Sequence, residues 1–180
     1  ISSWLVISLF GAIPFMYSSS SLSYTDAFFE SVSGITTTGA TVINNLENLS
    51  EGILIWRSLL QWFGGIGIIV LAMAILPTLQ IGGMQLLHME HDDPYEKTIP
   101  KVNRFVIELF ILYVSISILC AFLYFVNGMK GFDSIIHAMT TISTGGFSNY
   151  DESFSYFNSF KLESISIIFM LVGSLPFVLY

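Results

Sequence analysis

The chain has 180 residues, of which 53% are hydrophobic and only 11% are charged, with 6 Lys and Arg residues against 13 Asp and Glu. Soluble domains carry about 25% charged residues, and a soluble fold of this length has no means of covering so much apolar surface. With a net charge of -7, the chain has too few cationic side chains to neutralise phosphate groups. The composition therefore excludes a soluble enzyme, a disordered tail and a nucleic-acid binder, and it indicates a membrane protein.

Four apolar segments have the length, or nearly the length, that a helix needs to cross a bilayer. They are residues 1–17, 53–77, 105–126 and the segment from 162 to 180. The first has no initiating methionine and the last is still apolar at Tyr180, so we expect the chain to be part of a longer protein.

Two further segments, residues 25–41 and 133–148, are too short and too rich in hydroxyl groups to cross a bilayer. Each has an Asp near its start, as suits a helix N-terminus, then a short helical stretch and a run of Thr, Ser and Gly. Irregular backbone is tolerated at membrane depth only where it is buried in protein or lines water. We therefore predict two re-entrant hairpins that form a pore or a binding site.

The two short segments repeat one another at a fixed spacing of 107 residues. The matched pairs are Asp26 and Asp133, Ile35 and Ile142, Thr36 and Ser143, Thr37 and Thr144, Gly39 and Gly146, and Thr41 and Ser148. The predicted fold is thus all-α, with a helix, half-helix and helix unit used twice, in residues 1–77 and 105–180. Such duplication is typical of channels and transporters. Two spans separate the short segments, so both units have the same orientation and the linker, residues 78–104, lies on the opposite face.

The two faces of this predicted fold differ in acidic residues but not in basic ones. Basic residues are balanced between the faces, so the positive-inside rule does not decide the orientation. The face that carries the short segments holds most of the acidic residues, namely Asp26, Glu30, Glu47, Glu51, Asp133, Asp151, Glu152 and Glu163. An acidic vestibule would concentrate cations, and ordinary solvated loop charges are the alternative.

The hydroxyl-rich end of each short segment has the composition of a cation site. A dehydrated monovalent cation needs a ring of oxygens, which backbone carbonyls supply where the chain is extended and glycine permits the necessary φ angles. The C-terminal dipole of each half-helix would add negative potential. We predict an ion filter built from Thr36, Thr37, Thr38 and Gly39 together with Ser143, Thr144, Gly145 and Gly146. Polar turns near the lipid headgroups are the alternative.

Arg57 lies near the outer start of the second span, where an unpaired charge is costly. Glu30, on the first half-helix, is the predicted partner, and the pair would support the filter from behind. An arginine whose side chain reaches the membrane interface is the alternative. We expect His137 to pack and to form hydrogen bonds. The segment from His88 to Asp93 has metal-ligand residue types, but its paired Asp residues and Pro94 indicate a solvated loop, so no metal site beyond the transported ion is expected.

Several segments resemble the Trk/Ktr/HKT family of cation transporters, which is related to potassium channels. The sequences DAFFESVSGITTTGATV and WRSLLQWFGGIGIIVLAMAILPTLQIGGMQL resemble the first pore loop and second helix of the Trk branch, and HAMTTISTGGFSNYD and FMLVGSLPFVLY resemble the second pore loop and its following helix. The resemblance implies four helix–pore loop–helix repeats around one pore, of which the chain holds the first and most of the second. It also implies one key glycine per repeat, here Gly39 and Gly146, and glycine at both positions favours K+ over Na+.

The function that the resemblance implies is transmembrane potassium uptake by a multi-pass protein of the bacterial inner membrane. Its expected partners are the lipid bilayer, a cytosolic nucleotide-binding regulatory ring of the TrkA type and a second copy in a homodimer. No catalytic triad, phosphate loop or metal cluster occurs in the sequence, so no enzyme activity is expected. The alternatives are a sodium-conducting or sodium-coupled transporter of the same architecture and a non-conducting assembly subunit.

Overall fold

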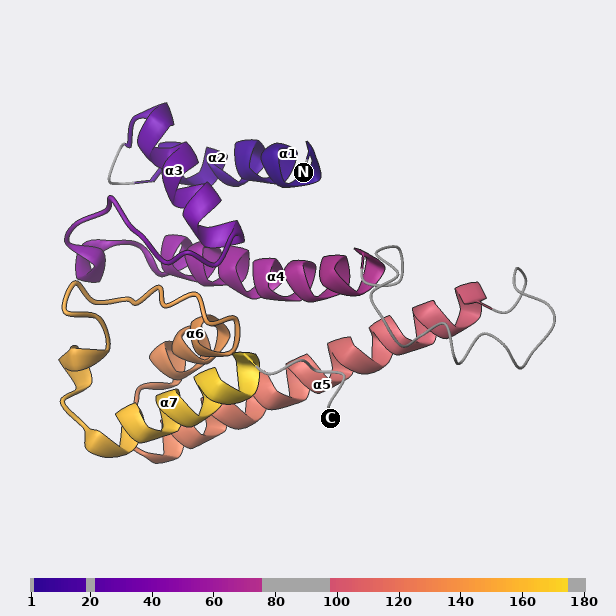
Figure 1. The fold of residues 1–180 in the computed structure, drawn as a ribbon. Helices are drawn as coiled ribbons and strands as arrows, with labels where there is room; N and C mark the ends of the chain where they lie inside the picture. Colours follow the sequence, from indigo (N-terminus) through magenta and orange to yellow (C-terminus); the bar gives the residue numbers. More distant parts are fainter. Residues whose placement is uncertain (1, 19–21, 76–97, 175–180) are drawn as a thin grey trace.

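The computed structural model describes residues 2–18, 22–75 and 98–174, and within these ranges it is helical and contains no strand (Figure 1). The first unit consists of α1 (Ser2–Gly11), α2 (Ile13–Met16), the half-helix α3 (Tyr24–Ile35), the short 3-10 turn η1 (Leu46–Asn48) and α4 (Glu51–Ile75). The second unit consists of α5 (Thr98–Val126), the half-helix α6 (Gly131–Ile142), η3 (Ser153–Phe157) and α7 (Phe160–Ser174).

The predicted helices are present, with two differences in their bounds. The segment predicted as one span, residues 1–17, is divided into α1 and α2 around Ala12. Pro14, in the first turn of α2, has no N–H group and its ring crowds the carbonyl four residues earlier, which breaks a continuous helix. The helix α5 begins at Thr98, ahead of the predicted start at residue 105. Most of the predicted linker, and the segment from His88 to Asp93, lie outside the described residues.

The outward faces of the long helices are apolar. Within the described residues, the segment Val106–Val126 of α5 is the one helix long and apolar enough to cross a membrane, with a mean hydropathy of 2.5. Ile118 in this segment is 64% exposed, and Phe10 of α1 and Leu171 of α7 are 68% and 62% exposed. Large apolar side chains on three different helices are thus open to the surroundings, which suits hydrocarbon rather than water.

Each half-helix packs between the longer helices of its own unit. The half-helix α3 contacts α1 and α4, and α6 contacts α5 and α7 (Figure 1). Each unit has its own apolar core, one around Phe15 and Leu60 and the other around Tyr124 and Phe169. Helix α6 also packs on α4, which joins the two units.

One glycine in the last helix of each unit marks the equivalence of the units. A Cβ atom on Gly64 of α4 would overlap the carbonyl oxygen of Ile35, the last residue of α3. A Cβ atom on Gly173 of α7 would likewise overlap the carbonyl oxygen of Ile142, the last residue of α6. Both glycines lie at the same distance from the start of their helix. The final helix of each unit therefore approaches its half-helix in the same way.

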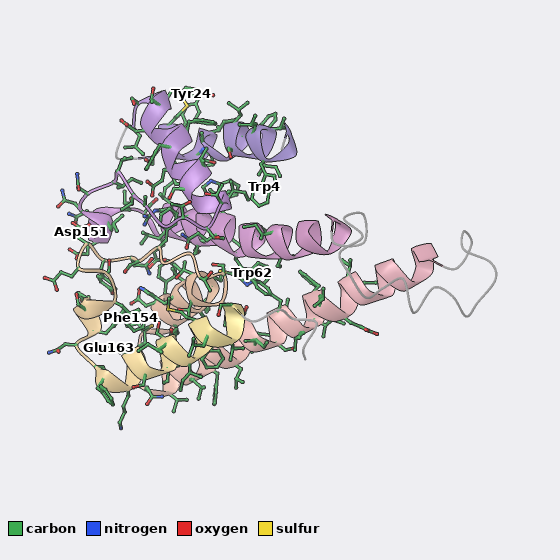
Figure 2. The ribbon with its side chains drawn as sticks, in the orientation of Figure 1. Trp4, Tyr24, Trp62, Asp151, Phe154 and Glu163 are labelled. Carbon is green, nitrogen blue, oxygen red and sulfur yellow. The ribbon has the colours of Figure 1, made fainter. Side chains whose placement is uncertain are left out.

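The chain segments that follow the two half-helices run at the same end of the fold, as predicted. Figure 1 shows these segments together, while the C-terminal end of α4 and the N-terminal end of α5 lie at the opposite end. The side chains of Asp151 and Glu163 lie at the end that carries the loops (Figure 2). We refer below to residues 36–45 as the first loop and to residues 143–152 as the second loop.

Candidate functional site

The two half-helices end in the same backbone conformation. Thr37 and Thr144 have left-handed φ angles of 55° and 54°, and Gly39 and Gly146 both have a φ angle of 78°. Left-handed backbone costs a residue with a Cβ atom about 1–2 kcal/mol, so the two threonines must be held in place by their surroundings.

Hydrogen bonds at the helix ends show how each chain reversal is held. In the first unit the Thr37 N–H donates to the Gly34 carbonyl at 2.9 Å, and the Thr38 N–H donates to the Ser33 carbonyl at 2.9 Å. The second unit repeats both bonds, from Thr144 to Thr141 at 3.0 Å and from Gly145 to Thr140 at 2.9 Å. This pattern is a Schellman motif, which ends the helix and turns the chain back along a new direction. Both loops therefore leave their half-helix along equivalent paths.

The backbone carbonyl groups at the start of each loop stand apart from the hydrogen-bond network of the described residues. Within the described part of the chain, no carbonyl oxygen of residues 36–39 or 143–146 accepts a hydrogen bond. Folded proteins pair nearly all of their backbone polar groups unless these face solvent or a ligand. These two carbonyl rows coincide with the residues that the sequence singled out as a cation site, and they remain available as ligands.

The carbonyl groups further along the loops are turned toward the protein. The Ala40 carbonyl oxygen accepts a hydrogen bond from Ser33 Oγ at 2.5 Å, so Gly39 is the last residue of the first loop whose carbonyl belongs to the row without an acceptor role. In the second loop, the Ser148 carbonyl oxygen accepts from Arg57 Nη1 at 3.0 Å. The protein thus fixes the outer part of each loop and leaves the inner part open.

Gln61 of α4 fixes the direction of one of the free carbonyl groups. Its Oε1 atom accepts the Phe147 N–H at 3.1 Å, and its side chain is fully buried. In a trans peptide the N–H and C=O groups point in opposite directions, so the Gly146 carbonyl points away from α4. Gln61 Nε2 is buried and has no hydrogen-bond partner in the part of the chain that the structure describes. A lone glutamine within an apolar helix was the sequence signal for this residue, and our sequence analysis missed it.

The two loops touch at Gly39. A Cβ atom on Gly39 would overlap the backbone carbonyl oxygen of Gly145, and a Cβ atom on Gly145 would overlap the side chain of Gln61. A Cβ atom on Gly146, in contrast, would meet no atom within 4 Å. The two glycines that match in the repeat have the same φ angle but different surroundings.

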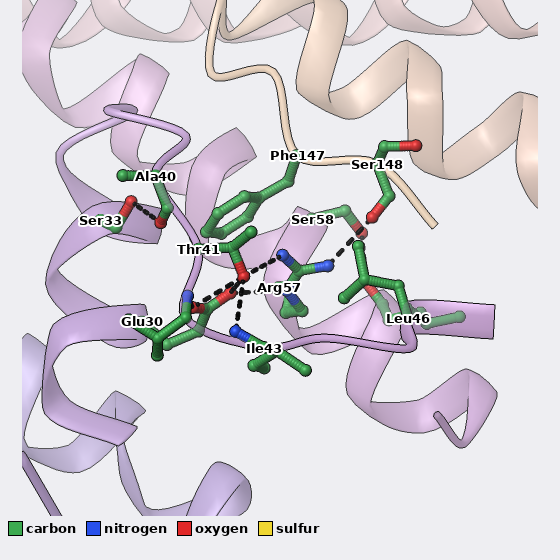
Figure 3. A network of polar contacts seen from close by, with 12 residues as sticks. Glu30, Ser33, Ala40, Thr41, Ile43, Leu46, Arg57, Ser58, Phe147 and Ser148 are labelled. Carbon is green, nitrogen blue, oxygen red and sulfur yellow. Dashed lines mark hydrogen bonds and ion pairs between the residues drawn. The ribbon is translucent and has the colours of Figure 1, made fainter. Parts of the chain in front are cut away.

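The ion pair predicted between Glu30 and Arg57 is present and buried (Figure 3). Arg57 Nε lies 2.8 Å from Glu30 Oε1, and the two residues are 1% and 0% exposed. Thr41 completes the group, because its Oγ1 donates to Glu30 Oε1 at 2.9 Å and accepts from Arg57 Nη2 at 3.1 Å. The alternative of an arginine that extends to the interface is wrong, since Arg57 is enclosed by protein.

Arg57 also connects the first unit to the second loop. Besides the bond to the Ser148 carbonyl, its guanidinium lies over the Phe147 ring, 4.2 Å from the ring centroid. A desolvated cation–π contact of this kind contributes about 2 kcal/mol. One side chain of α4 therefore contacts both loops.

The two matched aspartates have different roles. Asp26 lies in the first turn of α3, where Ser23 caps the helix by accepting the Asp26 N–H at 3.2 Å and donating to its carboxylate at 2.7 Å. Asp133 instead turns to the second loop and accepts from Asn149 Nδ2 at 2.8 Å and from the Tyr150 hydroxyl at 2.9 Å. Burial and the adjacent carboxylate raise the pKa of Tyr150, so this hydroxyl remains a hydrogen-bond donor.

A third contact between the units is made by Asp151 of the second loop. Its carboxylate accepts the N–H groups of Asn45 and Leu46, at 2.9 and 3.0 Å, where the first loop enters η1. A cavity of about 210 Å³ lies between the loops on this side, and Gly39, Gly146 and Asp151 are among its lining residues. The acidic residues predicted to form a vestibule thus divide into two groups. Asp26, Glu30, Asp133 and Asp151 accept hydrogen bonds, with Asp151 also exposed, whereas Glu47, Glu51, Glu152 and Glu163 are exposed loop or helix-start residues.

No group of three or more metal-ligating side chains occurs among the residues that the structure describes. His137 lies at the matched position of Glu30 and forms hydrogen bonds rather than taking part in such a group. Backbone carbonyl and hydroxyl oxygens are therefore the ligand types that the described site offers, and these suit hard monovalent cations.

Helices with apolar outer faces, joined by two polar loops at one end of the fold, define an integral helical membrane protein. The family model TrkH, described as a cation transport protein, matches residues 1–180. The chain belongs to this family of cation transport proteins. The resemblance found in the sequence to the Trk branch is confirmed.

The chain is similar along nearly its whole length to proteins of the Trk system. It is 45% identical over 99% of its length to the Trk system potassium uptake protein TrkI of Halomonas elongata. It is 46% identical over 98% of its length to TrkH of Escherichia coli strain K12. The crystal structure of the potassium transporter TrkH from Vibrio parahaemolyticus matches 98% of the chain at 43% identity, with a TM-score of 0.85. The chain spans 36% and 37% of the two curated relatives and 35% of the crystallised chain.

Proposed function

We propose that the two loops are two of the four strands of a selectivity filter through which the full-length protein takes up K+ across the membrane. The observation that carries the proposal is the pair of equivalent carbonyl rows, at residues 36–39 and 143–146, that accept no hydrogen bond within the described chain. A dehydrated cation requires such oxygens in place of its water. The names of the curated relatives, which are potassium uptake proteins, support K+ as the ion.

In this proposal the carbonyl groups of Thr36 to Gly39 and of Ser143 to Gly146 coordinate the ion as it moves inward. The C-terminal ends of α3 and α6 lie at the base of the loops, so each helix dipole adds about half a negative charge near the ion path. Glu30 and Arg57 act as filter supports, because they hold the outer part of both loops. Glycine at both Gly39 and Gly146 accords with K+ rather than Na+ by resemblance to the family.

The architecture that accompanies this function has helix–pore loop–helix repeats at residues 1–77 and 105–180, joined by a cytoplasmic linker at 78–104. We place the protein in the bacterial inner membrane as a multi-pass protein. Its proposed partners are a nucleotide-binding ring on the cytosolic side and a second copy in a homodimer. The relatives' Trk system names support a multi-component system.

The test uses the full-length protein in bacteria that lack potassium uptake. Wild type, Gly39→Ser and Gly146→Ser are compared for growth at low potassium and for rubidium and sodium influx, at matched membrane expression. Gly52→Ser is the control, because a Cβ atom on Gly52 meets nothing within 4 Å. We expect both filter variants to admit sodium relative to rubidium and the control to match wild type. If both filter variants keep the wild-type fluxes, the loops are not a filter. A sodium transporter would show sodium influx in the wild type that exceeds rubidium influx.

A further inference from the structure

We propose that His137 is the positioning residue of the second loop and serves as the neutral counterpart of Glu30 in the first unit. The inference rests on the proposed function, since it assigns a role in holding the filter. It begins from the repeat, because Glu30 and His137 are separated by the same 107 residues as the other matched pairs. Both side chains are buried, with exposed fractions of 0% and 2%.

The hydrogen bonds of these two residues follow one pattern. Glu30 accepts from Thr41 Oγ1 at 2.9 Å, and His137 Nε2 lies 3.1 Å from Ser148 Oγ. In both cases the hydroxyl belongs to the residue two positions after the filter glycine. Each hydroxyl oxygen also accepts the backbone N–H of the second residue beyond it, at 3.2 Å in the first loop and 3.1 Å in the second. The hydroxyl is therefore fixed on both sides in each loop.

The direction of the histidine bond follows from its partners. His137 Nδ1 lies 2.9 Å from the Asp133 carbonyl oxygen, which accepts only, so Nδ1 carries the proton. In the neutral ring Nε2 is then an acceptor, and Ser148 Oγ donates to it. In the first loop, too, the hydroxyl is the donor, because Thr41 Oγ1 donates to the Glu30 carboxylate. Both half-helices thus present a buried acceptor to a loop hydroxyl.

The second unit has no cation at the position of Arg57, which explains a neutral acceptor there. Helices α4 and α7 begin at Glu51 and Phe160, and this register aligns Gly64 with Gly173 and Arg57 with Ser166. A carboxylate at position 137 would be buried without a paired charge, which costs several kcal/mol.

Aromatic rings enclose His137 where the first unit has its ion pair. The rings of Phe154 and Phe157 meet the imidazole edge-on, with centroids 5.8 and 5.2 Å away. The Tyr150 ring is stacked at 6.4 Å. These contacts restrict the orientation of the imidazole, so the acceptor stays aimed at Ser148.

Ser148 is the point at which both units hold the second loop. Its hydroxyl is bound by His137 and its carbonyl oxygen is bound by Arg57 of the first unit. Gly146 lies two residues earlier and has open space beside it, so between Gly146 and Ser148 the loop is held through Phe147, by Gln61 and by the Arg57 guanidinium. Loss of the histidine bond therefore removes the contact of the Ser148 hydroxyl with α6, while the Ser148 carbonyl stays bound to Arg57 and the hydroxyl oxygen keeps the Tyr150 N–H, so Ser148 can shift relative to α6.

The test compares His137→Leu, His137→Gln and Ser148→Ala in the full-length protein by the ratio of rubidium to sodium influx per folded molecule. We expect His137→Leu and Ser148→Ala each to lower the ratio about fivefold, the effect of losing one ordinary hydrogen bond. Glutamine has the shape of Glu30, which reaches the matched hydroxyl in the first unit, so His137→Gln is expected to restore the ratio to near wild type. The control is Ser134→Ala, because this buried hydroxyl bonds only to backbone carbonyls near its own helix start.

The combined variant His137→Leu with Ser148→Ala provides a second readout. Since both changes remove the same bond, the pair is expected to lower the ratio no more than either change alone. A residue that only stabilised the fold would reduce the amount of folded protein and leave the ratio unchanged, and this result overturns the proposal. If His137→Leu does not fold, Ser148→Ala and His137→Gln still decide, because a wild-type ratio in Ser148→Ala contradicts the role. Gly146→Ser is measured in parallel, so an unchanged ratio there refutes the filter itself rather than the positioning residue.

Discussion

Arg57→Met provides the strongest test of how the two units are held together. Arg57 makes an ion pair with Glu30, hydrogen bonds to Thr41 and the Ser148 carbonyl, and a stacking contact with Phe147. Methionine is unbranched and fills a similar volume, so the loss is mainly one of charge and hydrogen bonds rather than of packing.

The size of the effect follows from the burial of the pair. Arg57 and Glu30 are 1% and 0% exposed, so removing the arginine leaves a buried carboxylate without its cation, which costs about 3–5 kcal/mol. Adding Glu30→Gln removes that charge, and the new amide still accepts from Thr41 Oγ1. We therefore expect the double variant to be more stable than Arg57→Met alone, by about 1–3 kcal/mol.

The assay is the fraction of full-length protein that stays folded and monodisperse in detergent after heating at a series of temperatures. Wild type is expected to survive to the highest temperature, followed by the double variant and then by Arg57→Met. Lys161→Met is the matched control, since Lys161 is exposed and its loss is expected to change stability by no more than about 0.5 kcal/mol. Two results refute the reasoning: survival of Arg57→Met at the wild-type temperature, or a double variant less stable than Arg57→Met.

Three further predictions concern the loops. Gly39→Ala is expected to reduce folding yield and rubidium uptake far more than Gly146→Ala. Both substitutions cost about 1–2 kcal/mol of left-handed backbone strain, but only the Cβ atom at position 39 displaces a backbone carbonyl. Equal losses of yield and uptake in the two variants would contradict the close contact of Gly39 with the Gly145 carbonyl. Gln61→Leu is expected to lower the ratio of rubidium to sodium influx and to change the free energy of unfolding by no more than about 1 kcal/mol. The substitution leaves the Phe147 N–H without its acceptor, but it also removes the buried Gln61 Nε2, which has no hydrogen-bond partner in the described structure. A large loss of stability with an unchanged influx ratio would contradict this prediction. Asp151→Ala is expected to increase amide hydrogen exchange in residues 45–48, and unchanged exchange there is the contrary outcome.

The helices and the duplication could be predicted from the order of the residues. Runs of apolar residues located the long helices, and the Thr, Ser and Gly runs located the end of each half-helix, because these signals depend on neighbours along the chain. The spacing of 107 residues also predicted which positions are equivalent, and Gly39 and Gly146 share their φ angle accordingly. The pairing of Glu30 with Arg57 could also be predicted, because a buried charge needs a partner of opposite sign and the sequence has few charged residues.

The contacts that join the two loops depend on how the helices pack and could not be predicted from the sequence. Gln61 binds the Phe147 N–H, Arg57 binds the Ser148 carbonyl and Asp151 binds the start of η1, and each of these contacts joins segments far apart in the sequence. No local periodicity specifies such partners, because they depend on how α4 and α6 pack against each other. The repeat predicted equivalence, yet the packing made Gly39 crowded and Gly146 open. Equivalent sequence thus produced the same backbone conformation in each loop, and the different neighbours of the two loops determined what each glycine tolerates.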